Sequence, residues 1–271
     1  CKQYSSTWRK DIEVNGDYKG LSNHNDRYAL NNFDRVLKKL SQKKRQQTTI
    51  ADLVNTEIDM MADGLNSVTM TGGEPLLDHR FSDMIQKFKN TKSVVVHSGL
   101  GVSETVLRRG LDAMSDTQHK TTLCISAESI GKNFEFNRQG SNWETFLRYI
   151  DIIKEYDVAI QFASTYSNLN ITDYVKFNTM FHEYPISMNM VYDPAFMSVY
   201  NLDDETKKQV INDIKQSRLS NSKNANEIIN TINQPTNEKL RQELRYFIQE
   251  FTRRRKISID FMPESFKTWI K

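Results

Sequence analysis

Five short apolar segments, each followed by a segment with helical periodicity, constrain the fold of this chain more than any other feature. The segments are rich in β-branched and other apolar residues, and we expect strands over residues 68–71, 93–97, 121–126, 158–165 and 186–191. The clearest of the intervening helices is predicted over 142–156, where Phe146, Ile150 and Ile153 fall on one face. This repeated alternation of strand and helix predicts a parallel sheet and therefore an α/β fold.

The segments before and after this series differ from it in their pattern of apolar residues. Amphipathic helices are predicted over 26–44 and 49–61, and residues 1–8 are expected to form a loop. Beyond Pro194 the chain becomes more polar, and helices with thin apolar stripes are predicted over 206–217, 226–232 and 238–252. We therefore expect two domains, residues 1–194 with the sheet and a mainly helical C-terminal extension over 195–271. The basic run 253–256 is interpreted as a solvated helix end rather than an anion site.

Composition excludes several classes of partner. The mean hydropathy of this 271-residue chain is -0.64, and no apolar run approaches the roughly 20 residues that span a bilayer, so no membrane partner is expected. The net charge of +3 is too small to predict nucleic-acid binding. Two cysteines do not make a disulfide framework, and no secretory signal is visible, which indicates the cytoplasm. Because the first residue is Cys1 rather than Met, we expect the chain to be part of a longer one.

A glycine turn follows the first predicted strand. Gly72 and Gly73 allow backbone angles that side chains forbid, and Glu74-Pro75 leads into a helical segment. Such a turn presents backbone groups at the C-terminal edge of a sheet, where α/β proteins bind ligands. One alternative is an ordinary strand-to-helix turn. A phosphate-binding domain is not favoured, because neither G-x-G-x-x-G nor G-K-[ST] occurs.

The Gly72–Pro75 tetrapeptide resembles the motif with which radical S-adenosylmethionine (SAM) enzymes hold the amino group of the cofactor. Cys1, followed by Ser5, Ser6 and Trp8, resembles the third cysteine of the C-x3-C-x2-C loop in twitch-domain-containing radical SAM proteins. In that family the loop supplies three thiolates to a 4Fe-4S cluster, whose soft iron ions they bind. This chain contains only the last of the three.

Three positions at later strand ends extend the resemblance. Ser98 stands where the family commonly has an asparagine near the cofactor. Ser126 and Glu128 stand where the family shows Ser-x-Asp, whose oxygens accept hydrogen bonds from the ribose or the amino group. Cys124, inside the same strand, is interpreted as a small core residue, and His97 as a satisfied strand-end histidine.

Arg138 belongs to a segment, Phe134–Trp143, that resembles the subgroup's aromatic–Glu–aromatic–x–Arg–x–Gly sequence. A guanidinium can bind a carboxylate through two hydrogen bonds, and the methionine end of SAM carries one. The resemblance therefore implies that Arg138 binds this carboxylate. The alternative is a structural arginine that pairs with Glu135 or Glu144.

Together these matches imply a partial (βα)6 TIM-type barrel, whose first strand lies upstream or is lost, with the named residues on one rim. They imply reductive cleavage of SAM to a 5′-deoxyadenosyl radical, which abstracts hydrogen from a substrate that is often a peptide or protein in relatives. Such enzymes receive electrons from a donor such as flavodoxin or ferredoxin. The alternative is a non-catalytic barrel that binds SAM or a peptide. A complete C-x3-C-x2-C ending at Cys1 would distinguish the two.

Overall fold

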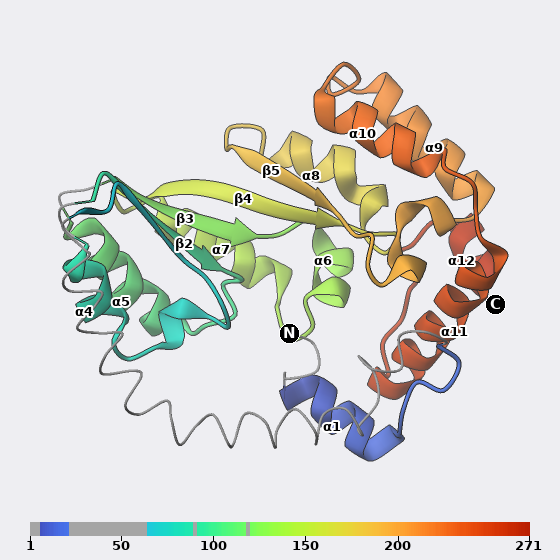
Figure 1. Ribbon diagram of the computed structural model, residues 1–271, viewed down its shortest axis with the longest axis horizontal. Helices are drawn as coiled ribbons and strands as arrows, with labels where there is room; N and C mark the ends of the chain where they lie inside the picture. Colours follow the sequence, from blue (N-terminus) through green and yellow to red (C-terminus); the bar gives the residue numbers. More distant parts are fainter. Residues whose placement is uncertain (1–5, 22–63, 89–90, 118–119) are drawn as a thin grey trace. The chain divides into compact units, whose positions relative to one another are not determined.

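The computed structural model describes residues 6–21, 64–88, 91–117 and 120–271 (Figure 1). Cys1 and the helices predicted over 26–44 and 49–61 lie outside the described residues. The chain divides into two compact units. The first, which we call the sheet unit, is Val54–Met190. The second, the helical unit, combines the N-terminal part up to Leu53 with Val191–Lys271.

The sheet unit contains one parallel five-stranded sheet that curls into a half barrel (Figure 1). Its strands follow the sequence order from one edge to the other: β1 (Ser67–Met70), β2 (Ser93–Ser98), β3 (Lys120–Ser126), β4 (Ala159–Tyr166) and β5 (Ile186–Met190). Every neighbouring pair is parallel. The five strands and the α/β class predicted from the alternation are confirmed.

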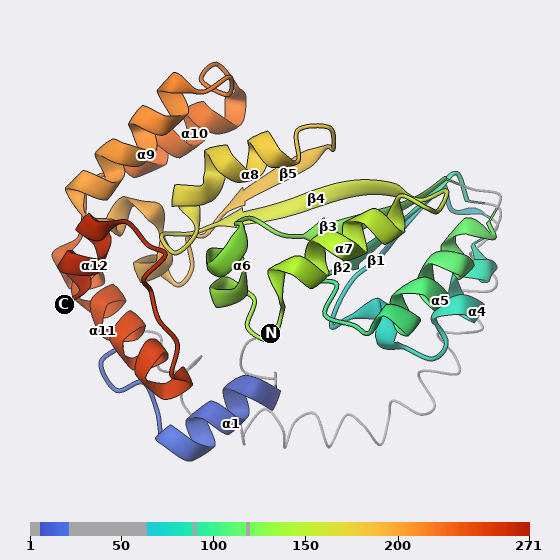
Figure 2. The same cartoon turned by 180° about the vertical axis from the view of Figure 1, so that it is seen from behind.

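Helices connect the consecutive strands. They are α4 (Phe81–Lys87), α5 (Glu104–Ser115), α6 (Gly131–Asn137), α7 (Trp143–Ile153) and α8 (Tyr174–Met180), with short 3-10 turns η3 (Pro75–Leu77) and η4 (Ile171–Asp173). Ser103 and Asn142 cap α5 and α7 by accepting hydrogen bonds from Val106 and Thr145. Because crossovers between parallel neighbours are right-handed, successive helices pack on the same face of the sheet, as Figure 2 shows for α5 and α7.

This helix-covered face forms the apolar core. Every second strand residue is buried against the helices: Val94 and Val96 of β2, Leu123 and Ile125 of β3, Ile160 and Phe162 of β4. In the register, Val96, Leu123 and Ile160 lie side by side on adjacent strands. The alternation leaves the other set of side chains on the opposite face of the sheet.

The structure corrects three of the sequence expectations. The first strand was expected to be buried, but its residues alternate between exposed and half-buried. Among the described residues β1 pairs only with β2, so it lies at a sheet edge. The loop expected over 1–8 is wrong from residue 6 on, because α1 (Ser6–Asn15) begins there. Helix α6 was not predicted, since seven residues are too few to show a repeated apolar period.

The helical unit contains α1, α9 (Asp204–Gln216), α10 (Lys223–Ile232), α11 (Glu238–Arg255) and α12 (Glu264–Ile270), with 3-10 turns η5 (Ala195–Met197) and η6 (Val199–Asn201). The solvated helix end expected over 253–256 is wrong for Arg254, whose side chain is 2% exposed. Its guanidinium donates to the backbone oxygens of Gly16 and Asp17 and lies 3.9 Å from the ring centre of Tyr18. None of the described helices combines the length and apolar character needed to cross a membrane.

Candidate functional site

The C-terminal ends of the strands meet at one edge of the sheet, and most of the predicted site residues lie there. The Gly72–Pro75 turn follows β1, Ser98 ends β2, and Ser126 ends β3. Arg138 is the residue after the last turn of α6, which follows β3. Parallel pairing therefore brings together segments that are more than fifty residues apart in the chain.

Glu74 is held at this edge by the neighbouring strand. Its Oε2 accepts a hydrogen bond of 3.0 Å from the backbone N–H of Gly99. Its Oε1 is buried and has no hydrogen-bond partner among the described residues. A buried carboxylate oxygen without a donor is costly, because it has lost water and gained nothing in return. Glu74 is thus an acceptor in position for a ligand that donates hydrogen bonds.

The turn before Glu74 depends on glycine for its backbone angles. Gly72 has φ 98° and Gly73 has φ 55°, both in the left-handed region that residues with a side chain avoid. No atom lies within 4 Å of the place where a Cβ would stand at either position. The constraint is therefore conformational rather than steric. Pro75, the first residue of η3, directs the chain away from the edge.

Arg138 forms an ion pair with Glu128. Its Nη2 lies 2.7 Å from Glu128 Oε2, and the side chains are 23% and 7% exposed. The sequence suggested Glu135 or Glu144 as the structural partner. The structure instead pairs Glu135 with Lys132 and with the backbone N–H of Trp143. Glu128 is thus engaged with the guanidinium at one oxygen, while Arg138 Nε is buried without a partner in the described chain.

Gly99 brings the two charged groups together, and sequence reasoning missed it. A Cβ at this position would stand 3.8 Å from Arg138 Nη1 and 4.0 Å from Glu74 Oε2. The guanidinium and the carboxylate therefore converge above the same stretch of backbone. The only sequence signal was the glycine that follows Ser98 at the end of a strand.

The two serines behave differently. Ser98 is 2% exposed, and its Oγ accepts a hydrogen bond of 2.9 Å from the N–H of Leu100, so its hydroxyl stabilises the local turn. Leu100 itself has φ 55°, a strained angle for a residue with a side chain. Ser126 is half-buried at the end of β3, and its hydroxyl forms no hydrogen bond within the described chain. Ser126 is therefore free to contact a ligand, whereas Ser98 is occupied.

The described residues contain no group of three or more His, Cys, Asp or Glu side chains that could hold a metal ion. Cys1 lies outside them. Cys124 is 2% exposed, and burial raises the pKa of its thiol, which opposes the thiolate form that binds metals. Its expected burial is confirmed, although it lies on the face opposite the helix-covered core.

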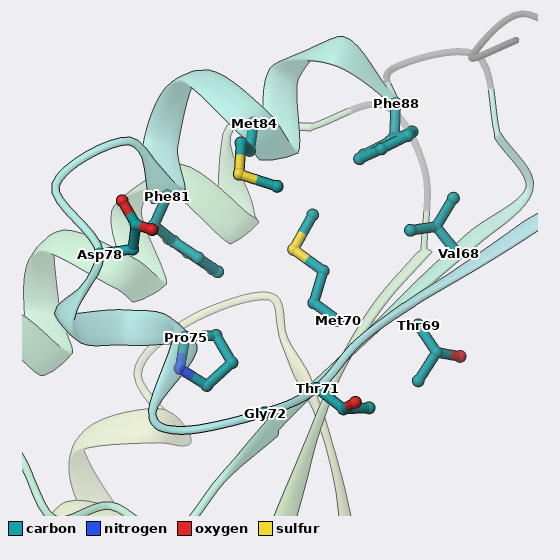
Figure 3. Close-up of a pocket in the computed structure, with 10 residues that line it drawn as sticks. All are labelled: Val68, Thr69, Met70, Thr71, Gly72, Pro75, Asp78, Phe81, Met84 and Phe88. Carbon is teal, nitrogen blue, oxygen red and sulfur yellow. The ribbon is translucent and has the colours of Figure 1, made fainter. Parts of the chain in front are cut away.

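A cavity of about 390 Å³ lies beside the turn, between β1 and α4. Figure 3 shows Met70 and Met84 pointing toward one another across it, with Thr69 on the other side of the strand. The remaining walls are mainly apolar: Val68, Pro75, Phe81 and Phe88. The cavity therefore belongs to the helix-covered side of the sheet and not to the charged edge.

Comparison with known proteins does not place the chain in a family. No protein-family model matches it, and no curated protein is significantly similar to it in sequence. What the site binds must therefore be inferred from its geometry and charge.

Proposed function

We propose that this chain is a radical SAM enzyme, in which the observed half barrel is part of a partial (βα)6 TIM-type barrel. The observation that carries the proposal is Glu74 Oε1, a buried acceptor without a donor, beside the left-handed diglycine turn. The Gly72–Pro75 resemblance supports it, because it implies an ammonium group at this place.

The described residues fit the methionine end of SAM. Its ammonium would donate to Glu74 Oε1, and its carboxylate would accept from the unpaired N–H groups of Arg138. Glu128 would orient Arg138, and Ser126 would contact a polar group of the cofactor. Glu74, Glu128 and Arg138 together carry a charge of about −1, which complements the charge of about +1 on SAM.

The residues of this chain do not by themselves fit a 4Fe-4S cluster. Such a cluster takes three thiolates in this family, and the sequence contains Cys1 and the buried Cys124. The resemblance to radical SAM enzymes also implies a peptide or protein substrate, an electron donor such as flavodoxin or ferredoxin, and a cytoplasmic location. These belong to the proposal.

A second candidate is a non-catalytic barrel that binds SAM or a peptide. This candidate needs only the Glu74–Arg138 site and no cluster. The enzyme and a SAM-binding barrel share SAM binding and differ in whether SAM is cleaved.

Calorimetric titration with SAM tests what they share. We expect the wild-type chain to bind SAM. Glu74→Gln should bind SAM at least about tenfold more weakly, because it removes a charge-assisted hydrogen bond. The control Glu144→Gln, at an exposed position, should bind SAM as the wild type does. Absence of SAM binding by the wild-type chain would refute the enzyme and the SAM-binding barrel, and would leave only a barrel that binds a peptide.

Anaerobic reconstitution with iron and sulfide separates them. The protein encoded by the complete reading frame would be reduced with dithionite, and 5′-deoxyadenosine would be measured by chromatography. Its formation from SAM, and its loss in Cys1→Ala, supports the enzyme. SAM binding without 5′-deoxyadenosine supports the binding module.

A further inference from the structure

Asp173 is a buried carboxylate that stands at the start of one helix and holds another. It is the residue before α8, a position where an aspartate usually accepts a hydrogen bond from the first turn of its own helix. Its side chain makes no such bond. Its Oδ2 instead accepts hydrogen bonds from the backbone N–H of Ile130, at 3.2 Å, and from Asn133 Nδ2, at 3.0 Å. Both donors belong to the start of α6.

These two bonds connect one carboxylate oxygen to both members of the charged pair at the sheet edge. Ile130 is two residues after Glu128 and directly precedes α6, and its own side chain does not cap this helix. Asn133 Oδ1 accepts a hydrogen bond of 2.7 Å from Asn137 Nδ2. Asn137 is the residue before Arg138. The path therefore runs along one side of α6 and ends at the guanidinium residue.

The carboxylate is itself fixed to the end of β4. The backbone N–H of Asp173 donates to the carbonyl of Asn170, at 3.0 Å. The Asn170 carboxamide donates to the carbonyl of Thr165 and accepts from the N–H of Ser167. Thr165 lies in β4, which pairs with β3 inside the sheet. Asp173 thus transmits the position of a paired strand to the neighbouring helix.

The ion pair of Asp173 with Lys176 does not account for this placement. Lys176 Nζ lies 3.8 Å from Asp173 Oδ1, and the lysine side chain is 66% exposed. Ion pairs that are open to water in this way contribute little to stability. The main contacts of the Asp173 side chain are therefore the two hydrogen bonds to the start of α6.

We propose that Asp173 is a positioning residue of the charged edge. By fixing α6 it sets the place of the Arg138 guanidinium, and therefore the spacing of ammonium and carboxylate that the edge accepts in a ligand. Arg138 Nη2 lies 2.7 Å from Glu128 Oε2, and a hydrogen bond of this length weakens steeply when its geometry is disturbed. The inference rests on the proposed function for the identity of the ligand, but its effect on the ion pair is testable without one.

The first test uses the ion pair alone. The double-mutant cycle of Glu128→Gln and Arg138→Met is measured by urea unfolding in the wild-type chain and in Asp173→Ala. Asp173→Asn is the conservative variant, because its amide oxygen can accept from both donors. Ser103→Ala is the matched structural control, because it removes the cap of another helix, α5.

In the wild-type chain we expect the two changes to be coupled by at least about fivefold in the folding equilibrium constant. In Asp173→Ala the coupling should fall below about twofold, because the guanidinium no longer stands opposite the carboxylate. Asp173→Asn and Ser103→Ala should keep the coupling, although Ser103→Ala lowers stability. Asn133→Leu removes one of the two bonds and should reduce the coupling at least about twofold, which covers the case that Asp173→Ala does not fold.

The second test measures ligand selectivity by calorimetry. SAM is compared with decarboxylated SAM, which keeps the ammonium and lacks the carboxylate. The wild-type chain should bind SAM at least about tenfold more tightly than this analogue, because only SAM pairs with Arg138. Asp173→Ala should reduce this preference at least about threefold, and Asp173→Asn should retain it.

Three results would overturn the inference. They are wild-type coupling in Asp173→Ala or Asn133→Leu, an equal loss of coupling in Ser103→Ala, and an unchanged preference for SAM in Asp173→Ala. The two proposals fail separately. If the wild-type chain does not bind SAM but Asp173→Ala loses the coupling, the proposed function fails and this inference stands. If SAM binds and the coupling survives in Asp173→Ala, the reverse holds.

Discussion

The Glu128–Arg138 ion pair gives the sharpest test of how the site is built. Glu128→Gln keeps the shape of the side chain and a neutral acceptor but removes the charge that faces the guanidinium. Arg138→Met removes the guanidinium and keeps an apolar stem. The double variant removes both charges. If the pair orients Arg138, the two single changes must depend on each other.

The expected magnitude follows from the burial of the two groups. Unit charges about 4 Å apart attract by about 4 kcal/mol at an effective dielectric constant of about 20. Desolvation offsets part of this gain, and Arg138 is 23% exposed, so water screens the pair further. Breaking a fully buried pair costs about 3 to 5 kcal/mol, whereas a surface pair contributes less than about 1 kcal/mol. We therefore expect each single variant to lose about 2 kcal/mol of unfolding free energy.

Urea unfolding followed by tryptophan fluorescence measures this loss in the sheet unit. Trp143 packs against Phe134, on the helix that carries Arg138, and the substitutions Trp8→Phe and Trp269→Phe make it the only tryptophan. The double variant should lose at least about 1 kcal/mol less than the sum of the single losses, because one pair is removed once. Additive losses, or single losses below about 0.5 kcal/mol, would refute the role given to this pair.

Three further predictions concern the helical unit. Arg254→Met should lower the free energy of unfolding by about 3 kcal/mol, because it removes a buried guanidinium that donates to two backbone oxygens. The same change should release α1, which amide hydrogen exchange would measure. Unchanged exchange in α1 would contradict this prediction. Glu250 has its pKa lowered from 4.5 to about 2, first by its hydrogen bond with Arg253. The contribution of ionised Glu250 to the free energy of unfolding is therefore complete above pH 4.5 and is lost as the pH falls toward 2. Glu250→Gln should flatten the dependence of the unfolding free energy on pH in this range. The control Glu227→Gln, at an exposed position, should leave it unchanged. Gly20→Ala should lower the free energy of unfolding by about 1 to 3 kcal/mol, because a Cβ at this position would stand 2.6 Å from the ring of Tyr246. Thermal or urea unfolding would measure the loss. An unchanged unfolding free energy would contradict the prediction and show that the ring moves aside.

The sequence carried most of the information about the sheet. Strands such as 121–126 and helices such as 142–156 are long and periodic enough to be recognised locally. The exposure of β1 was not predictable in the same way. Its residues have the composition of a buried strand, and only the strand order places them at an edge. Burial of a strand depends on its neighbours, which its own sequence does not specify.

For the site residues, too, local features were predictable from the sequence and long-range contacts were not. The Gly72–Glu74 turn was predicted because its glycines leave a local signature, and the positive φ angles confirm the need for them. The partner of Arg138 was not predicted. Glu135 and Glu144 are nearer in sequence than Glu128, but Arg138 follows the last turn of α6, and the chain direction there turns its guanidinium back toward the end of β3. Gly99 was missed because it contributes a backbone N–H and empty space.

The charges at the C-terminal edge of the sheet indicate what kind of ligand this edge can select. At the edge, Glu74 is held by a backbone N–H and Arg138 by Glu128, so both charges are fixed before a ligand arrives. A preorganised edge therefore favours a ligand whose ammonium and carboxylate stand at matching positions.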